Sequence, residues 1–269
     1  MITGLKINEQ RKQMYYEKGY WGKDTVLDAW DNAVKNYGER EYVADDQGRR
    51  YTYAEVDDKA SRLASWLKEI GIEVGDVVTI QFPNWAEFTV AYVAILKVGA
   101  VIHPVPKNYN DADLTYIMNL VHAKAFICPT YFHHTDYEQQ AIDAMKECPS
   151  VKAIAVCDKF EPARYGTISL STICETHEPL QEKPEVSSDD VVVILSTSGT
   201  TGNPKGVMLT HRNVISNIQG VLKNLQPSGH ETFLSFLPLS HTFERTTSYY
   251  LALGLGYTTC SISPALPTK

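Results

Sequence analysis

Short apolar segments alternate with amphipathic helical patterns along most of the 269-residue chain. The apolar runs at Val77–Ile80, Ala125–Cys128 and Val151–Val156 are nearly continuous and do not alternate with polar residues. Helices are predicted between and beside them, including Asp111–Val121 and Tyr137–Glu147. A strand that is buried on both faces has such a continuous pattern, and strands separated by helices pair in parallel. We therefore predict an α/β fold, with a mostly parallel sheet that has helices on both faces.

Several polar residues stand where helices are expected to begin. Thr52 and Glu55 have the spacing of a capping box, in which each side chain accepts a hydrogen bond from an unpaired backbone N–H. Asn84 and Thr210 stand directly before two other apolar helical patterns, and both residue types are good helix caps. We expect all three positions to mark helix starts.

Residues Ser196–Gly206 read Ser-Thr-Ser-Gly-Thr-Thr-Gly-Asn-Pro-Lys-Gly and follow a predicted buried strand at Val191–Leu195. Glycines let successive backbone N–H groups converge on one anion, because they adopt conformations that other residues avoid. The hydroxyl groups add hydrogen-bond donors, and Lys205 adds a positive charge. The stretch therefore predicts a phosphate-binding loop, followed by a helix from about Thr210.

Two other known loop motifs do not match this stretch. A P-loop ends in Gly-Lys-Ser/Thr, but here Pro204 takes the glycine position and Gly206 the hydroxyl position. Pro204 has no N–H to donate, and Gly206 has no hydroxyl to hold Mg²⁺. The Gly-x-Ser-x-Gly turn of serine hydrolases fails as well, because Ser196 and not a glycine stands two positions before Ser198. The loop belongs to neither class.

Composition argues against several other kinds of protein. The net charge is −7 with no block of lysines or arginines, which argues against a nucleic-acid partner. We expect no transmembrane segment, because no run of about 18 apolar residues occurs. The five cysteines are odd in number without a C-x-x-C pair, and the amino terminus lacks the apolar core of a signal peptide. We therefore expect a cytoplasmic protein with reduced thiols.

The pattern Thr-Ser-Gly-Thr-Thr-Gly-x-Pro-Lys-Gly at residues 197–206 closely resembles the signature of the adenylate-forming (AMP-binding) acyl-CoA synthetases. Three further stretches resemble parts of that family: Tyr51–Glu55, Pro83–Trp85 and Phe236–Glu244. The resemblance runs from about residue 20 to the end of the chain. It implies part of the large amino-terminal domain of an adenylate-forming ligase, which activates a small-molecule carboxylic acid with ATP.

The same resemblance implies roles for particular residues. The loop would hold the β- and γ-phosphates of ATP, and Lys205 would act as a catalytic residue that counters the charge of the departing pyrophosphate. His241 would be a second catalytic residue between the acyl carboxylate and the nucleotide; the alternative is a turn residue whose ring is satisfied by the backbone. Glu244 and Arg245 are expected to form a local ion pair or a solvated face. ATP, Mg²⁺ and coenzyme A are the expected cofactors, with no protein residue assigned to the metal. The residues implied in phosphate binding are Thr197, Ser198, Gly199, Thr200, Thr201, Gly202 and Lys205.

The resemblance also implies a domain organisation. Members of the family are about twice as long as this chain, and the later motifs of their sites, including a carboxy-terminal lysine, are not found in it. We therefore expect residues 1–269 to be a truncated amino-terminal adenylation domain. A first subdomain with the phosphate loop would span about 52–226, and about 20–50 and 227–269 would form part of a second. That incomplete part would expose apolar surface beside a strand predicted to be buried at Phe233–Leu237, and a homodimer could cover it.

The sequence leaves three functions open. The first is ATP-dependent conversion of a carboxylic acid to an acyl-adenylate and then to an acyl-CoA thioester, with Phe243-Glu244-Arg245 favouring a fatty acid. The second is an enzyme that adenylates an aryl acid or passes the acyl group to a carrier-protein thiol, since Lys18–Trp21 is reminiscent of aryl-acid relatives. The third is a nucleotide-binding module without catalytic activity.

Overall fold

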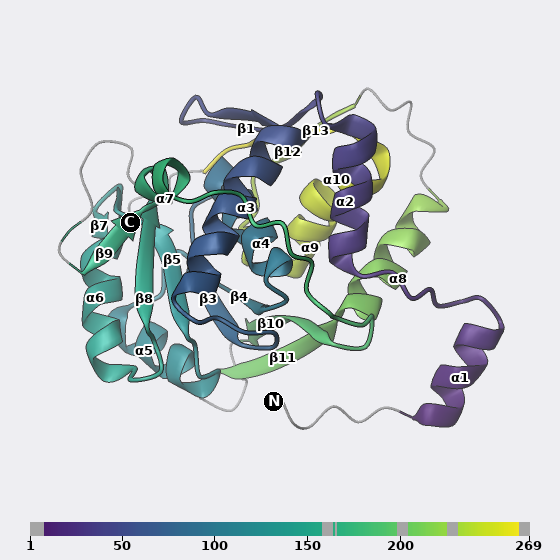
Figure 1. The fold of residues 1–269 in the computed structure, drawn as a ribbon, viewed down its shortest axis with the longest axis horizontal. Coiled ribbons are helices and arrows are strands. Elements are labelled where there is room, and N and C mark those ends of the chain that lie inside the picture. Colours follow the sequence, from purple (N-terminus) through teal and green to yellow (C-terminus); the bar gives the residue numbers. More distant parts are fainter. Residues whose placement is uncertain (1–7, 158–163, 165, 198–203, 225–230, 264–269) are drawn as a thin grey trace.

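The computed structural model of the protein describes residues 8–157, 164, 166–197, 204–224 and 231–263. Two sheets, of seven and four strands, form the framework of these residues (Figure 1). A small hairpin of β6 (Tyr131–Phe132) and β7 (Thr135–Asp136) adds to them. The larger sheet carries the phosphate-loop motif, and the smaller sheet leads into the His241 motif.

The larger sheet is mostly parallel, which confirms the predicted fold class. Among its described strands, every neighbouring pair is parallel except β10 and β11. In spatial order the strands are β11 (Lys205–Thr210), β10 (Val191–Thr197), β4 (Val101–Val105), β3 (Val77–Gln81), β5 (Ala125–Pro129), β8 (Ala153–Cys157) and β9 (Thr167–Ser169).

Both faces of this sheet are buried, and helices cover each of them. Along β5 the side chains of Ala125 and Ile127 join one apolar cluster, while Phe126 and Cys128 join another. Because strand side chains alternate between faces, a continuous apolar run supplies two cores at once. The helices of the first cluster include α3 (Tyr53–Glu69) and α4 (Ala86–Lys97), those of the second are α5 (Asp111–Leu120) and α6 (Tyr137–Glu147), and α7 (Leu170–Thr176) packs against α3.

The smaller sheet combines two segments that are far apart in the sequence. Its strands, in spatial order, are β12 (Thr232–Ser235), β13 (Thr258–Ser261), β1 (Glu41–Asp45) and β2 (Arg50–Thr52). Only the β1–β2 pair is antiparallel among these strands. The helical segments associated with it are α2 (Val26–Tyr37), α9 (Thr242–Arg245), a π-helical turn at Thr246–Tyr250 and α10 (Leu251–Leu255).

The strand β12 is shorter and more exposed than the sequence predicts. The expected buried strand Phe233–Leu237 ends at Ser235, and the side chains of Leu234, Phe236 and Leu237 are exposed. The reason is position, because β12 is an edge strand of its sheet within the described residues. A short apolar run does not by itself show whether a strand lies at the centre or at the edge of a sheet.

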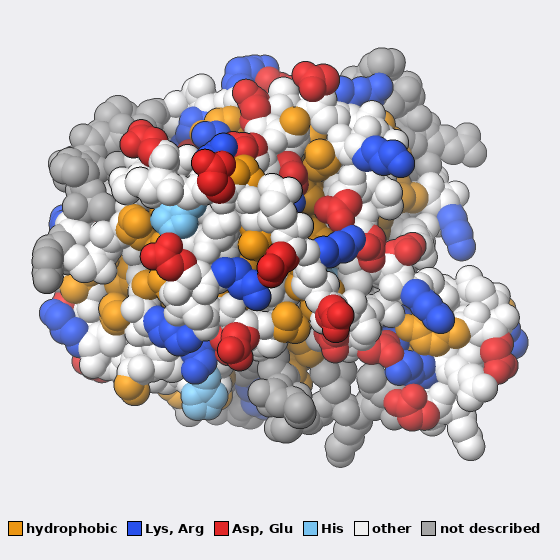
Figure 2. All heavy atoms as spheres, viewed as in Figure 1, with side chains coloured by type: hydrophobic (Ala, Val, Ile, Leu, Met, Phe, Trp, Pro, Cys, Tyr) orange, Lys and Arg blue, Asp and Glu red, His pale blue; other side chains and the backbone are white. Residues whose placement is uncertain are grey.

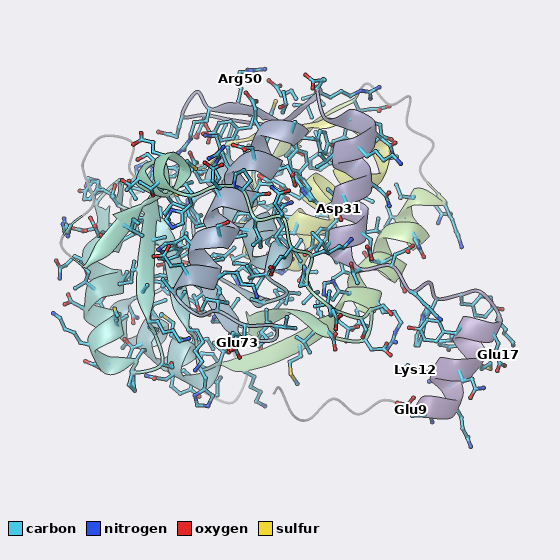
Figure 3. The ribbon with its side chains drawn as sticks, viewed as in Figure 1. Glu9, Lys12, Glu17, Asp31, Arg50 and Glu73 are labelled. Carbon is cyan, nitrogen blue, oxygen red and sulfur yellow. The ribbon has the colours of Figure 1, made fainter. Side chains whose placement is uncertain are left out.

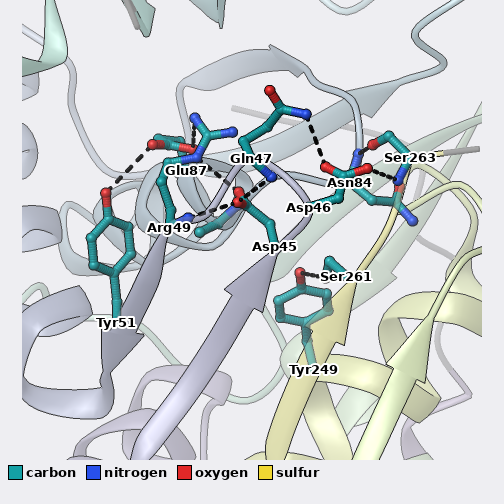
Figure 4. A network of polar contacts seen from close by, with 11 residues as sticks. Asp45, Asp46, Gln47, Arg49, Tyr51, Asn84, Glu87, Tyr249, Ser261 and Ser263 are labelled. Atoms are coloured by element: carbon teal, nitrogen blue, oxygen red, sulfur yellow. Dashed lines mark hydrogen bonds and ion pairs between the residues drawn. The ribbon is translucent and has the colours of Figure 1, made fainter.

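A buried ion-pair network joins the smaller sheet to α4 (Figure 4). Arg49, in the β1–β2 turn, pairs with Asp45 at 2.8 Å and with Glu87 of α4 at 2.6 Å. The Arg49 guanidinium also lies 4.3 Å from the centre of the Trp85 ring. Burial raises the pKa of Glu87, and the charge of Arg49 opposes that rise. Removing one partner would leave an uncompensated buried charge, so the network holds the hairpin against α4.

Two of the three predicted helix caps are confirmed, and the third is wrong. Thr52 and Thr210 both form capping boxes, at the starts of α3 and of α8 (His211–Leu222). Helix α4 instead begins after Trp85, which makes no side-chain capping bond. Asn84 does not cap it, because its amide group binds backbone atoms from a distant part of the chain.

Helix α1 (Glu9–Glu17) lies at the edge of the molecule and buries none of its residues (Figure 3). Lys12 forms an ion pair with Asp189, and the Tyr16 hydroxyl lies 2.9 Å from Ser188 Oγ. These contacts come from one side of the helix, so polar interactions rather than a hydrophobic core attach α1 to the body.

The surface carries charges of both signs. Figure 2 shows acidic and basic side chains interspersed over one face of the molecule, without a large area of a single sign. In the part of the chain that the structure describes, no helix is long and apolar enough to cross a membrane.

Candidate functional site

The phosphate-loop motif lies at the turn end of the hairpin that β10 and β11 form. Thr197 ends β10 and Lys205 begins β11, and the two residues are paired across the hairpin. The Thr197 hydroxyl donates to the Lys205 carbonyl oxygen at 3.4 Å, and both residues are exposed. The structure therefore brings together the first and last of the predicted phosphate-binding residues. The others, Ser198, Gly199, Thr200, Thr201 and Gly202, lie outside the described residues.

Strand β11 is the element of this site that the sequence does not predict. The expected order is strand, loop and helix, whereas β11 separates the loop from α8. The apolar run Val207–Leu209 is the sequence signal for this strand, but it is too short to predict one with certainty of type. Gly206 has a packing role here, because a Cβ atom at this position would lie 3.0 Å from Ile194 Cγ2. Glycine therefore lets β11 approach β10 closely beside Lys205.

Lys205 carries a positive charge that is available to a ligand. Its residue is exposed, and none of the ion pairs in the described part of the chain involves it. An ammonium group without a carboxylate partner is suited to bind an oxygen of a phosphate group.

Three side chains from adjacent strands form a polar row that is fully buried at Thr79 and His103 and half-buried at Ser196, which belongs to the hairpin. His103 of β4 is fully buried, with Nδ1 2.9 Å from Thr79 Oγ1 of β3 and Nε2 2.9 Å from Ser196 Oγ of β10. Burial lowers the pKa of His103 to about 3, so the ring is neutral near pH 7. The sequence does not reveal this row, because it depends on the spatial order of the strands.

The His241 motif forms a turn that is held from behind by two side chains. Asn84 donates from Nδ2 to the Leu237 carbonyl oxygen at 2.7 Å and accepts at Oδ1 from the Leu239 N–H at 3.3 Å. Arg245 donates from Nη1 to the Leu239 carbonyl oxygen at 2.6 Å. His241 itself is exposed and accepts a bond from the Phe243 N–H at Nδ1, at 3.3 Å. The turn is therefore fixed while the His241 ring stays accessible from solvent.

The prediction of a solvated face or local ion pair at Glu244 and Arg245 is wrong. Both residues are buried, and Glu244 accepts a hydrogen bond from the Ser248 hydroxyl at 2.8 Å. The Arg245 guanidinium instead binds the backbone of the turn, as described above. Charged residues in a short helix usually face water, so only the packing of α9 against the body could reveal their burial.

A cavity of 570 Å³ lies between the hairpin, α8 and α9. Its volume is within the range of small-molecule sites. The lining combines apolar side chains with amide and hydroxyl groups, and Thr242 directly follows His241. The cavity thus connects the strands of the phosphate loop with the helix of the His241 motif. Its lining residues include Val193 and Leu209 of the hairpin, Asn213, Val214 and Asn217 of α8, and Thr242, Phe243 and Arg245 of α9.

The described residues do not fit a metal site of their own. No group of three His, Cys, Asp or Glu side chains in this part of the chain could hold a metal ion. Protein-bound magnesium is commonly held by one or two carboxylates together with substrate phosphates. We therefore assign none of the described residues to Mg²⁺.

Comparison with known proteins identifies a family model and several ligases that this chain resembles. A family model described as "AMP-binding enzyme" matches residues 30–269. The medium-chain fatty-acid–CoA ligase of Escherichia coli K12 is 36% identical over 241 residues, which are 90% of this chain and 42% of that protein. The 2,3-dihydroxybenzoate-AMP ligase of Bacillus subtilis is 26% identical over 236 residues, 87% of this chain and 42% of that protein.

A solved structure agrees in fold. The apo structure of Mycobacterium smegmatis MbtA matches with a TM-score of 0.83 and 26% identity, over 94% of this chain and 46% of that one. The chain therefore spans less than half the length of each of these relatives.

Proposed function

The chain belongs to the AMP-binding enzyme family, and from that premise we propose that it forms part of an ATP-dependent acid–thiol ligase that acts on a fatty acid. The observation that carries the proposal is the shared cavity, which joins the strands of the phosphate loop to the helix of the His241 motif. A nucleotide and an acyl chain must meet at one place for such a reaction. The strands of the phosphate-loop motif and the helix of the His241 motif lie on two sides of this cavity.

The proposed reaction has two steps. A carboxylate oxygen of the acid attacks the α-phosphorus of ATP, so that an acyl–phosphate bond forms and pyrophosphate leaves. The thiol sulfur of coenzyme A then attacks the acyl carbon, which gives the thioester and releases AMP. The reactants of the first step are both anions, so the site must offset their charge and hold them in line.

We assign the phosphates to the turn end of the β10–β11 hairpin. Lys205 would offset the charge that develops on pyrophosphate, since its ammonium group is exposed and has no carboxylate partner among the described residues. The Thr197 hydroxyl, paired opposite Lys205, would turn from the Lys205 carbonyl oxygen and donate to a phosphate oxygen instead. Ser198–Gly202 would complete the binding loop. Magnesium would reach the site with the phosphates of ATP, whose charge it neutralises when bound.

We assign the acyl chain to the 570 Å³ cavity. Its apolar side chains, among them Val193, Val214 and Phe243, can cover a hydrocarbon chain. The carboxylate would lie at the end near Thr242, where His241 begins the helix. His241 would then contact the carboxylate or the nucleotide, a role for which its ring is exposed.

Replacement of Lys205 tests the phosphate assignment. We expect Lys205→Ala in the intact protein to lower acid-dependent ATP–pyrophosphate exchange by about 10- to 150-fold, equivalent to roughly 1.5–3 kcal/mol for a lost charged contact. Lys223→Ala, an exposed lysine at the end of α8, is the matched control and should leave exchange unchanged. Equal activities of the two variants would contradict the role of Lys205.

The substrate class is tested by the acid that supports exchange. We expect octanoate to support it better than 2,3-dihydroxybenzoate, because the relative named for a fatty acid is 36% identical and the one named for the aryl acid 26% identical. If 2,3-dihydroxybenzoate supported exchange and octanoate did not, the substrate would be an aryl acid and the proposed fatty acid would be wrong. ATP binding without exchange for any acid would favour a nucleotide-binding module.

A further inference from the structure

The polar row of Thr79, His103 and Ser196 crosses three neighbouring strands and ends at the phosphate-loop motif. The strands β3, β4 and β10 are adjacent in the sheet, and Thr79 is paired with His103 in register. Each ring nitrogen of His103 lies 2.9 Å from one hydroxyl oxygen. The row therefore connects the centre of the sheet to Ser196, the residue before Thr197.

His103 occupies a position that an apolar side chain could fill at lower cost. The His103 side chain is completely buried. Val101, the neighbouring residue on the same face of β4, packs in an apolar cluster with Val77 and Ile194. A buried polar ring costs free energy unless both of its nitrogens are hydrogen-bonded. Burial lowers the pKa of His103 to about 3, so one nitrogen donates and the other accepts near neutral pH. The two hydroxyls can satisfy both.

Ser196 is the residue of the row that belongs to the β10–β11 hairpin. It is paired with Gly206, the residue after Lys205. Because side chains alternate along a strand, Thr197 lies on the opposite face from Ser196, and the contact of Ser196 with His103 restrains the end of β10 that carries both residues. Thr197 is exposed there and donates to the Lys205 carbonyl oxygen.

We propose that His103 is a positioning residue for nucleotide phosphate, acting through its Nε2 contact with Ser196 to set Thr197 opposite Lys205. The proposal rests on the function proposed above. His103 does not touch the substrate in this assignment; it controls the end of β10 from inside the sheet.

Two substitutions separate the contacts of His103. The amide of glutamine reaches the position of Nε2, so His103→Gln keeps a partner for Ser196 and loses the one for Thr79. Asparagine reaches the position of Nδ1, so His103→Asn keeps Thr79 and loses Ser196. Both remove the ring, so both should lower the thermal midpoint of unfolding to a similar extent.

The measured quantity is the KM for ATP in pyrophosphate exchange, beside the KM for the acid. We expect His103→Asn to raise the KM for ATP about 3- to 10-fold, the range of one lost neutral hydrogen bond, while His103→Gln stays within about 2-fold of the wild type. The KM for the acid should change less than 2-fold in either variant, since the acyl cavity does not include His103.

Variants of the two hydroxyl residues complete the test. Ser196→Ala should reproduce the effect of His103→Asn, and combining the two should add little, because both remove the same contact. Thr79→Val should leave the KM for ATP unchanged although it removes the other partner.

The proposal is overturned if His103→Gln and His103→Asn raise the KM for ATP equally, or if Thr79→Val raises it as much as Ser196→Ala. Its failure is distinct from failure of the proposed function. If the wild type binds ATP but exchanges pyrophosphate with no acid, the proposed function fails, and the same variants are compared by calorimetric Kd for ATP. A wild type that does not bind ATP overturns both.

Discussion

The two places that bear the candidate residues are held by different means. Thr197 and Lys205 stand at the end of two paired strands, so backbone hydrogen bonds set their relative position. The His241 turn follows the exposed edge strand β12 and is held by two side chains that come from other elements, Asn84 and Arg245. A backbone ladder keeps two strands paired when one side chain is lost, so only the fine position of the strand end can change, whereas a turn held by side chains depends on each of them. The turn should therefore be the more sensitive of the two regions to substitution.

Removal of the Asn84 amide should have the largest effect. Asn84→Ala leaves the Leu237 carbonyl and the Leu239 N–H without partners, and we expect a loss of about 2–4 kcal/mol in the free energy of unfolding. The turn should also shift, so acid-dependent exchange should fall by more than the loss of stability explains. Urea unfolding and pyrophosphate exchange measure the two effects.

Asn224→Ala is the matched control for the loss of the Asn84 amide. Asn224 lies at the exposed end of α8 and donates to the Gly220 carbonyl oxygen at 2.8 Å. Asn224→Ala removes the same amide from solvent-exposed surroundings, where water replaces the lost bond, and should cost less than about 0.5 kcal/mol. If the two variants were equally stable, the turn would not depend on Asn84.

Lowering the pH should decrease the free energy of unfolding, because two buried histidines lie beside the β10–β11 hairpin. Burial lowers the pKa of His103 to about 3 and that of His211, which follows β11, to about 4, against about 6.5 in an unfolded chain. Between these values the unfolded state binds more protons, so stability is full above about pH 6.5 and falls as the pH is lowered toward 4. Each histidine should contribute up to about 1.4 kcal/mol per pH unit in that window.

Unfolding in urea at pH 7, 6 and 5 measures this slope. His103→Gln and His211→Gln remove one titrating group each, and each should make the stability of the protein less dependent on pH over this range. A slope that neither substitution changes would show that the buried histidines are not the source, and that carboxylates alone account for it.

The exposed edge of the smaller sheet should give the smallest effect. Leu234 projects from β12 and is 54% exposed, so Leu234→Thr removes little buried apolar area. We expect a change of less than about 0.5 kcal/mol in the free energy of unfolding, since a β-branched residue suits a strand. A loss above 1 kcal/mol would indicate that another surface covers β12 in solution.

Local signals in the sequence predict most of the larger sheet and of the helices that pack on it. Helix α6 has the predicted bounds Tyr137–Glu147, and α5 begins at Asp111 as expected. The capping box at Thr52 forms because all of its atoms lie within a few residues. Apolar period and capping depend on near neighbours, and these are visible in a single sequence.

The features that the sequence misses depend on distant partners. Asn84 fails as a helix cap because the backbone of Leu237, 153 positions away, takes its amide donor. The burial of Arg245 and the contact of His103 with Ser196 likewise require segments that only the tertiary fold brings together. The motif at 197–206 indicated phosphate chemistry, but the strand β11 that begins at Lys205 exists only through its pairing with β10.

The smaller sheet has a consequence for how the protein is made. The Thr258 hydroxyl in β13 donates to the Glu41 carbonyl oxygen in β1, across 217 positions of the chain. A nascent chain leaves the ribosome from its amino terminus, so the β1–β2 hairpin emerges long before the strand that will cover its edge. Strands of the larger sheet such as β3, β4 and β5 can meet much earlier. Non-local parallel pairing is slow, and an open strand edge is a template for wrong partners. We therefore expect residues 41–52 to be the segment that most needs chaperone protection during synthesis.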